Sequence, residues 1–136
     1  MRLLLVEDDK SIALGLEYSL SQEGFDVATC YDAKTALELL KSSKFDFALL
    51  DIGLPDGDGF DICRKLKEKA DTPVIFITAR DDEGSVVMGL DIGADDYITK
   101  PFRIRELQSR IRSVLRRTNK QNNEDSILQY GNVIIN

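Results

Sequence analysis

The sequence predicts an α/β fold built on a doubly wound, five-stranded parallel sheet with the strand order 2-1-3-4-5. One pattern along the chain predicts it. Short apolar runs alternate five times, before residue 117, with segments whose apolar residues recur every three or four positions. Such alternation is typical of a parallel sheet with helices on both faces, and right-handed crossovers restrict it to a doubly wound topology. The length of 136 residues is that of one ordinary domain with a short appendage.

The five apolar runs are the predicted strands, at residues 2–6, 26–30, 45–50, 73–77 and 95–99. The segments between and after them are predicted helices, because their apolar residues have helical spacing. These residues are Ile12, Leu16 and Leu20; Ala33, Ala36, Leu37 and Leu40; Ile62, Cys63 and Leu66; Val86 to Leu90; and Ile104, Leu107, Ile111, Val114 and Leu115. A turn-rich stretch, residues 53–59, separates the third strand from its helix.

The pattern ends near Arg117, so residues 1–117 are the predicted main domain. Residues 118–127 are polar and indicate a linker. Residues 128–136 are typical of short strands, and a lone hairpin is not stable in water. They therefore either add to another sheet or begin a second, incomplete domain.

Composition excludes several kinds of site. The chain has no histidine, which removes His-ligated zinc, Ser-His-Asp triads and Cys-His dyads. Two cysteines, Cys30 and Cys63, are too few for a disulfide scaffold. No apolar run approaches the roughly 18 residues of a membrane helix, so we expect a cytoplasmic protein with no membrane partner.

Charge is distributed unevenly along the chain. The net charge is −6, yet residues 1–100 carry −10 and residues 101–120 carry +6. An acidic body does not attract a phosphate backbone. We therefore interpret the basic segment as the exposed face of one helix rather than a nucleic-acid site.

Ligands of open α/β sheets bind beyond the carboxyl ends of the strands. The first strand ends in Glu7-Asp8-Asp9, the third in Asp51, the fourth in Thr78 and the fifth in Lys100. In the order 2-1-3-4-5, the first and third strands are neighbours, so Glu7, Asp8 and Asp51 converge. Converging carboxylates repel one another, and a hard cation such as Mg²⁺ relieves the repulsion.

Asp51 is the predicted working group, since it stands alone after an apolar strand. A carboxylate can act as a nucleophile and form an aspartyl-phosphate. Such a transfer needs a cation and a fixed positive charge on the phosphoryl oxygens. Lys100 can supply that charge, and Thr78 can donate a hydrogen bond.

These residues carry a family resemblance. Glu7-Asp8, Asp51, Thr78-Ala79, Tyr97 and Lys100-Pro101 resemble the receiver domain of bacterial two-component response regulators, with a flavodoxin/CheY-like (βα)5 fold, over residues 1 to about 118. Residues 89–102 resemble the OmpR/PhoB subfamily in particular. The tail does too, since there a linker leads to a small sheet that opens a winged-helix DNA-binding domain. The reading helix is absent, so the resemblance implies a fragment.

The resemblance implies a phosphoacceptor and switch rather than an enzyme. Asp51 would accept a phosphoryl group from a kinase phosphohistidine, with Mg²⁺ (or Mn²⁺) as the cofactor. Asp8 would bind the cation directly, Glu7 mainly through water, and Gly53 through its carbonyl. Lys100 would pair with the phosphoryl group and precede a cis peptide bond to Pro101. Thr78 and Tyr97 would be the switch residues.

The resemblance also implies partners. A sensor histidine kinase would contact Ser11, Ile12 and Gly15, although Ile12 could equally be a core residue. Activated subunits would form a homodimer through the fourth helix, fifth strand and fifth helix, and promoter DNA would bind the missing output domain. The residues of that dimer face would be Val87, Leu90, Asp95, Asp96, Glu106, Arg110 and Arg112. Val86 stands where the subfamily usually has a base facing Glu106 of the other subunit.

Three rival functions fit these residues less well. A stand-alone receiver would have no output domain, whereas the tail resembles the start of one. A phosphatase of the haloacid-dehalogenase type looks for a second acid two residues after its nucleophile, where this chain has Gly53. A flavin-binding module needs a phosphate loop after the first strand, where Glu7-Asp8-Asp9 would repel a phosphate.

Overall fold

Five parallel strands form one sheet in the order β2-β1-β3-β6-β7, which confirms the predicted order. The computed structural model describes the backbone of residues 1–130 and the side chains of residues 1–118. The strands are β1 (Arg2–Val6), β2 (Asp26–Cys30), β3 (Phe47–Leu50), β6 (Val74–Thr78) and β7 (Asp96–Thr99). Because every neighbouring pair is parallel, all five carboxyl ends lie at one edge.

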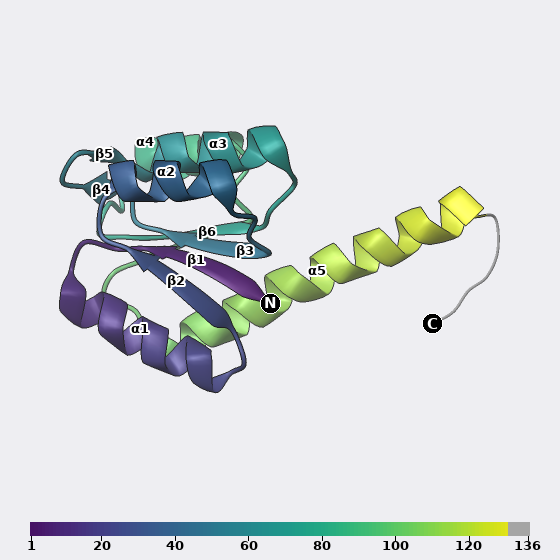
Figure 1. Cartoon of the computed structure of the whole chain (residues 1–136), viewed down its shortest axis with the longest axis horizontal. Helices are drawn as coiled ribbons and strands as arrows, with labels where there is room; N and C mark the ends of the chain where they lie inside the picture. Colours follow the sequence, from purple (N-terminus) through teal and green to yellow (C-terminus); the bar gives the residue numbers. More distant parts are fainter. Residues whose placement is uncertain (131–136) are drawn as a thin grey trace.

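Five helices cover the two faces of this sheet. They are α1 (Lys10–Gln22), α2 (Ala33–Ser42), α3 (Gly59–Lys69), α4 (Glu83–Asp91) and α5 (Ile104–Tyr130). α1 and α5 lie on one face, and α2, α3 and α4 lie on the other (Figure 1). The fold class predicted from the alternation of elements is confirmed.

Aspartates begin four of the helices. Each carboxylate accepts hydrogen bonds from N–H groups of the first turn, which have no partner within the helix. These N-caps are Asp9, Asp32, Asp58 and Asp82, before α1, α2, α3 and α4. The loops between strand ends and helix starts are thereby held by local bonds, and these loops form the edge where the site lies.

The sheet is buried on both faces. Along β1, Leu3 and Leu5 pack with α1 and α5, whereas Leu4 and Val6 pack with α2 and α3. Successive strand side chains point to opposite faces, so a strand covered on both sides is a continuous apolar run. The full burial of β1, β3 and β6, apart from Arg2, gives the site a rigid base.

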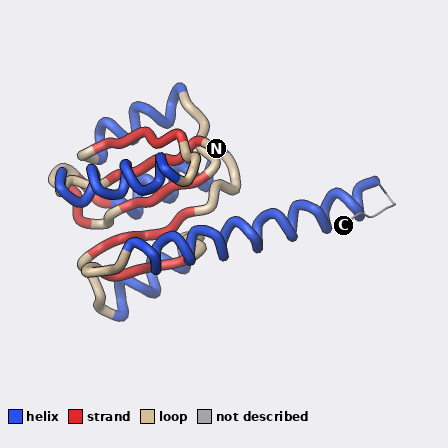
Figure 2. The backbone as a smooth tube through the Cα atoms, turned by 90° about the horizontal axis from the view of Figure 1, so that it is seen from below, coloured by secondary structure: helices blue, strands red, loops and turns tan. Residues whose placement is uncertain are grey.

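The structure differs from the predicted elements after residue 117. α5 continues to Tyr130, so residues 118–127 are helical rather than an irregular linker, and residues 128–130 are not a strand. No glycine or proline interrupts residues 104–130, and polar residues alone do not end a helix. Figure 2 shows α5 running on past the sheet. The rest of the predicted output segment, residues 131–136, lies outside the described residues, and the division into domains stays a prediction.

A short hairpin was not predicted. β4 (Gly53–Leu54) and β5 (Gly57–Asp58) pair antiparallel within the turn-rich stretch after β3. Two-residue strands are too short to show an alternating pattern, so turn residues were the only signal.

None of the helices in the described part of the chain is both long enough and apolar enough to cross a bilayer.

Candidate functional site

The side chains predicted from the strand ends meet at the carboxyl edge of the sheet. Glu7 follows β1, Asp51 follows β3, Thr78 ends β6 and Lys100 follows β7. Val6 and Leu50 are register partners in the adjacent strands β1 and β3, which places the residues that follow them side by side. The parallel sheet therefore brings together groups that lie far apart in the chain.

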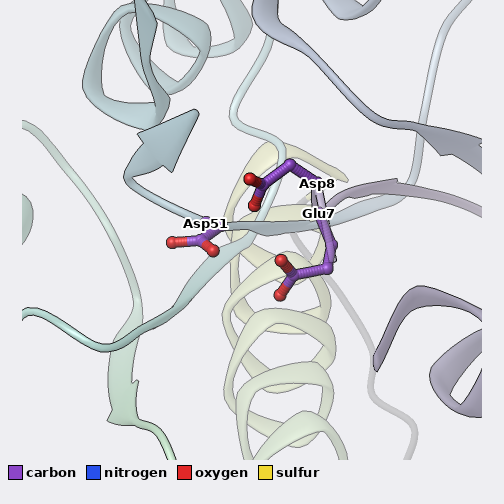
Figure 3. A group of neighbouring side chains, drawn as sticks. All are labelled: Glu7, Asp8 and Asp51. Atoms are coloured by element: carbon purple, nitrogen blue, oxygen red, sulfur yellow. The ribbon is translucent and has the colours of Figure 1, made fainter. Parts of the chain in front are cut away.

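Three carboxylates form an acidic cluster. Glu7, Asp8 and Asp51 each offer an oxygen, and these oxygens lie within 4.8 Å of one another. Glu7 and Asp51 are buried, and Asp8 is exposed. Figure 3 shows the three carboxyl groups around a common space. The exposed member leaves this space accessible from solvent.

Lys100 pairs with two of these acids. Its Nζ lies 2.8 Å from Asp51 Oδ2 and 2.5 Å from Glu7 Oε1. Burial alone would lower the pKa of Lys100, but its bonds to Asp51 and Glu7 outweigh burial and raise the pKa. Lys100 is therefore a fixed positive charge directly beside Asp51, as the sequence predicted.

Glu7 is the most perturbed acid of the site. Burial raises its pKa to about 7, and the opposing effects of Lys100 and of the Asp9 N–H do not cancel that rise. Glu7 Oε2 accepts a hydrogen bond from Asp9 N at 3.1 Å. Glu7 Oε1 forms an ion pair with Lys100 Nζ at 2.5 Å, which is its one described polar contact.

This donor set fits a hard divalent cation. Mg²⁺ prefers carboxylate and carbonyl oxygens and keeps several waters. The cluster supplies oxygens from Glu7, Asp8 and Asp51. Gly53 is adjacent, since its N–H donates to Asp51 Oδ1 at 3.2 Å.

The predicted switch residues are joined through Arg80. Thr78 Oγ1 accepts a hydrogen bond from Arg80 N at 3.3 Å, and the Tyr97 hydroxyl donates to Arg80 O at 2.6 Å. Tyr97 is half-buried, and its ring centroid lies 6.0 Å from that of Phe76. Burial of the ring raises the pKa of Tyr97. The loop after β6 therefore contacts both residues. The contacts use the backbone N–H and carbonyl of Arg80, which every residue type has, so the sequence does not indicate them.

The predicted dimer face is brought together only in part. Arg110 bonds Asp96 at 3.0 and 3.1 Å and Glu106 at 3.5 Å, so these three cluster. Val87 and Leu90 are exposed on α4. The side chains of Asp95 and Arg112 bond to residues outside this cluster, and the dimer face stays a prediction.

Local geometry explains why these two side chains point away from the cluster around Arg110. Asp95 accepts hydrogen bonds from Val74 N at 2.9 Å and Lys67 Nζ at 3.4 Å, because neighbouring residues of an extended chain point to opposite sides. Arg112 lies 3.7 Å from Glu23 beside α1, because two residues turn a helix by about 200°.

The predicted kinase-contact residues line a groove. Ser11 and Gly15 are exposed, and Ile12 is half-buried. All three line a groove of about 640 Å³ that also includes Lys100 and Phe102, between α1 and the loop after β7. Ile12 also packs against the core, and its contact with a kinase stays a prediction. The Lys100-Pro101 peptide bond is cis, as the resemblance implied.

A doubly wound parallel sheet with an acidic cluster and a lysine at its carboxyl edge defines a class of protein. Comparison with known proteins identifies that class. Residues 3–112 match the family described as the response regulator receiver domain, and the chain belongs to that family. Receiver domains are phosphorylation-activated switches that bind Mg²⁺ at an acidic pocket and interact with a histidine kinase. They are phosphoacceptors rather than classical enzymes.

Solved structures of such proteins resemble this chain closely. A CheY-like receiver domain from Methanospirillum hungatei is 31% identical with a TM-score of 0.83, and the match covers 88% of this chain and 97% of that one. The BeF3-activated receiver domain of RstA from Klebsiella pneumoniae is 32% identical with a TM-score of 0.78, covering 85% and 99%. DrrB of Thermotoga maritima, an OmpR/PhoB homolog, is 37% identical with a TM-score of 0.77, covering 86% and 53%.

Proposed function

We propose that this chain is the receiver domain of an OmpR/PhoB-type response regulator and that Asp51 is its phosphoacceptor. The observation that carries the proposal is the position of Asp51. It is a buried carboxylate that contacts Lys100 and lies within the acidic cluster. Residues 89–102 and the similarity to DrrB, whose structure is described as an OmpR/PhoB homolog, support the subfamily.

The proposed transfer moves a phosphoryl group from a kinase phosphohistidine to Asp51. An Asp51 carboxylate oxygen forms a bond to phosphorus as the bond from phosphorus to the imidazole nitrogen breaks. The imidazole leaves with the electron pair and takes up a proton. Lys100, already 2.8 Å from Asp51, pairs with the oxygens of the arriving group.

The metal site proposed beside Asp51 uses the chain's own oxygens. Asp8 and Asp51 carboxylates, the Gly53 carbonyl and, through water, Glu7 would hold Mg²⁺ or Mn²⁺. A bound ion would neutralise the negative charge of the phosphoryl group. Without a cation, three carboxyl groups share one space, and Lys100 is paired with two of them.

The proposed switch starts at Thr78. Its hydroxyl accepts from Arg80 N and still has its own proton to donate to a phosphoryl oxygen. Movement of Thr78 toward Asp51 would disturb Arg80, whose carbonyl holds the Tyr97 hydroxyl. Tyr97 would then turn inward toward the space that Thr78 leaves. A local charge would in this way bias the packing of β7 and α4.

The output proposed for this switch is dimerisation and control of transcription. The sensor kinase would dock at the groove lined by Ser11, Ile12 and Gly15, next to Lys100. The dimer would form through Val87, Leu90 and the cluster around Arg110. Promoter DNA would be bound by a winged-helix domain, not by residues 1–117.

Intact-mass measurement after incubation with acetyl phosphate and Mg²⁺ tests the phosphoacceptor. We expect one phosphoryl group on the parent chain, none without Mg²⁺, and loss of the group in base. Asp51→Asn should remain unlabelled, whereas Asp61→Asn, an exposed control on α3, should label normally. Equal labelling of Asp51→Asn would contradict the proposal.

A further inference from the structure

The β4–β5 hairpin is bonded to a helix by one side chain at its tip. Asp56 lies between the two short strands, and its carboxylate reaches the start of α2. Its Oδ1 accepts a hydrogen bond from Ala33 N at 2.7 Å, and its Oδ2 accepts one from Lys34 N at 3.0 Å. These N–H groups have no partner within the helix, so Asp56 satisfies two of them from 22 and 23 residues away.

The base of the hairpin is fixed separately. Gly59 N donates to Ile52 O at 3.0 Å, and a Cβ on Gly59 would stand 2.2 Å from Asp51 O, so backbone packs directly on backbone there. Leu54 is buried in the core. The hairpin is thus tied to the strand of Asp51 at one end and to α2 at the other.

The anchor on α2 is rigid. Ala33, Ala36 and Leu40 bury one side of α2 in the core. The tip also approaches this helix closely, since a Cβ on Gly57 would lie 3.2 Å from Ala33 Cβ. A carboxylate that bonds two N–H groups of such a helix holds its own loop in one place.

We propose that Asp56 is a positioning residue for the metal site. Among the described bonds, Asp56 has none with Glu7, Asp8 or Asp51; it acts by holding the hairpin whose first residue is Gly53. The inference rests on the proposed function, in which the Gly53 carbonyl is a metal ligand. Mg²⁺ demands near-ideal octahedral geometry, so a hairpin released from α2 would present this oxygen less often in the right place.

Asp32 provides a matched control. It caps the same helix and accepts a hydrogen bond from Thr35 N at 2.8 Å, but it belongs to the loop between β2 and α2. No described hydrogen bond or ion pair joins Asp32 to the hairpin. Removing either carboxylate weakens the start of α2, and only removing Asp56 frees the hairpin. The two substitutions therefore separate positioning from helix capping.

Calorimetric titration with Mg²⁺ alone, on the full chain, tests the proposal. Asp56→Ala should raise the Mg²⁺ dissociation constant about tenfold, the lower end of the roughly 10–100-fold loss known for residues behind metal ligands. Asp32→Ala should leave that constant within about twofold of the parent, and urea unfolding should show both variants destabilised. Equal Mg²⁺ affinities in the two variants would overturn the proposal.

Two further sets of variants separate the role of Asp56 from loss of folding and from failure of the metal site. If the alanine variants do not fold, Asp56→Asn and Asp32→Asn replace them, and only Asp56→Asn, which keeps one of its two acceptor oxygens, should weaken Mg²⁺ binding. Asp8→Asn tests the proposed metal site itself. If Asp8→Asn binds Mg²⁺ like the parent, the metal site is wrong; if it loses Mg²⁺ while both Asp56 variants keep it, only the role of Asp56 is wrong.

Discussion

At the scale of residues, Lys100 changes what the acidic cluster implies. The sequence alone predicts repulsion among Glu7, Asp8 and Asp51. In the structure, Lys100 pairs with Glu7 and Asp51, whereas Asp8 is exposed and has no ion pair among those described. Asp8 is therefore the acid of the cluster whose negative charge no described cation balances. Neutralising Asp8 should increase the stability of the metal-free protein.

Asp8→Asn tests this distribution of charge. Without metal, we expect its free energy of unfolding to equal or slightly exceed that of the parent. In the parent, Mg²⁺ at a hundredfold excess over its dissociation constant should add about 2.7 kcal/mol, because only the folded state binds it. Asp8→Asn should lose this increment, and Asp91→Asn, an exposed control on α4, should keep it. Urea unfolding with EDTA and with Mg²⁺ measures both, and an unchanged increment in Asp8→Asn would count against the site.

The raised pKa of Glu7 predicts a pH dependence of the metal-free protein. Its pKa is about 7 in the folded chain against 4.5 ordinarily, because the carboxyl group is buried. Between these values the folded state holds more protons than the unfolded state, so stability is present below pH 4.5 and declines as the pH rises through 7.

Glu7→Gln should remove this decline. Relative to Glu7→Gln, the parent should lose on the order of 1–3 kcal/mol between pH 5 and pH 8, since one pKa unit is worth about 1.4 kcal/mol. Urea unfolding in EDTA across this range measures the difference. Parallel pH profiles for the two proteins would show that Glu7 is not perturbed.

Residues at strand ends were predictable, and residues that act through the backbone were not. Glu7, Asp51, Thr78 and Lys100 follow apolar runs, and a parallel sheet must bring such ends together. Their position at one edge is confirmed, while their chemical roles stay predictions. Asp56 bonds to backbone N–H groups, and Arg80 uses only its own backbone in its contacts with the switch residues. Those contacts depend on loop geometry, which residue types alone do not encode.

At the scale of elements, α4 is the least buried helix among α1 to α4. Gly89 is its single buried residue, and Val87, Met88 and Leu90 are exposed. A Cβ on Gly89 would lie 3.1 Å from the ring of Phe76 and 3.2 Å from that of Tyr97. The absent side chain therefore lets α4 pack directly on the two rings.

Gly89→Ala should destabilise the protein in spite of the better helix propensity of alanine. Phe76 is fully buried and contacts Phe60 on its other side, so its ring has little room to move. Overpacking costs about 1–3 kcal/mol, and the Gly-to-Ala gain is about 1 kcal/mol. We expect a net loss of about 1 kcal/mol in urea unfolding.

Gly84→Ala is the matched control within α4. A Cβ there would meet only Asp82 Oδ2, at 3.5 Å, which is an ordinary contact. Stability should stay constant or rise by up to about 1 kcal/mol. If Gly89→Ala instead stabilises the protein, the rings of Phe76 and Tyr97 move aside for the added methyl group and the prediction is wrong.

The limits of two elements could not be predicted for opposite reasons. α5 extends past residue 117 because nothing in its polar continuation breaks a helix, whereas the prediction treated loss of apolar residues as the end of the element. The β4–β5 hairpin is shorter than any periodic signal. Apolar periodicity detects segments that pack one face against a core. Neither the polar end of α5 nor the short hairpin has such a face.

At the scale of the whole molecule, the face of α4, β7 and α5 has fewer free charges than the sequence suggested. Arg110 already bonds Asp96 and Glu106 of its own chain, and Asp95 and Arg112 are directed to other neighbours. A two-fold dimer on this face would exchange some of these bonds for equivalent ones across the interface. The gain in electrostatic free energy is then small, since exposed ion pairs contribute about 0.2–1 kcal/mol each.

Apolar contact must therefore provide most of the attraction in such a dimer. Val87 and Leu90 are both nearly half exposed, and Val86, where the subfamily usually has a base, is half-buried beside them. Each Å² of apolar surface that two subunits remove from water contributes about 25 cal/mol. We accordingly expect the phosphorylated chain to form a weak dimer, with a dissociation constant that changes little as salt is raised.

Sedimentation of the acetyl-phosphate-treated chain tests this expectation. Arg110→Glu adds an acid beside Asp96 and Glu106, so repulsion within and between subunits should leave it monomeric. Arg105→Glu makes the same charge change at an exposed residue of α5 for which no ion pair is described, and it should dimerise like the parent. Leu90→Ser, which removes apolar contact without adding charge, should weaken the dimer at low and high salt alike. If both Arg110→Glu and Leu90→Ser dimerise normally, the subunits pair through another face.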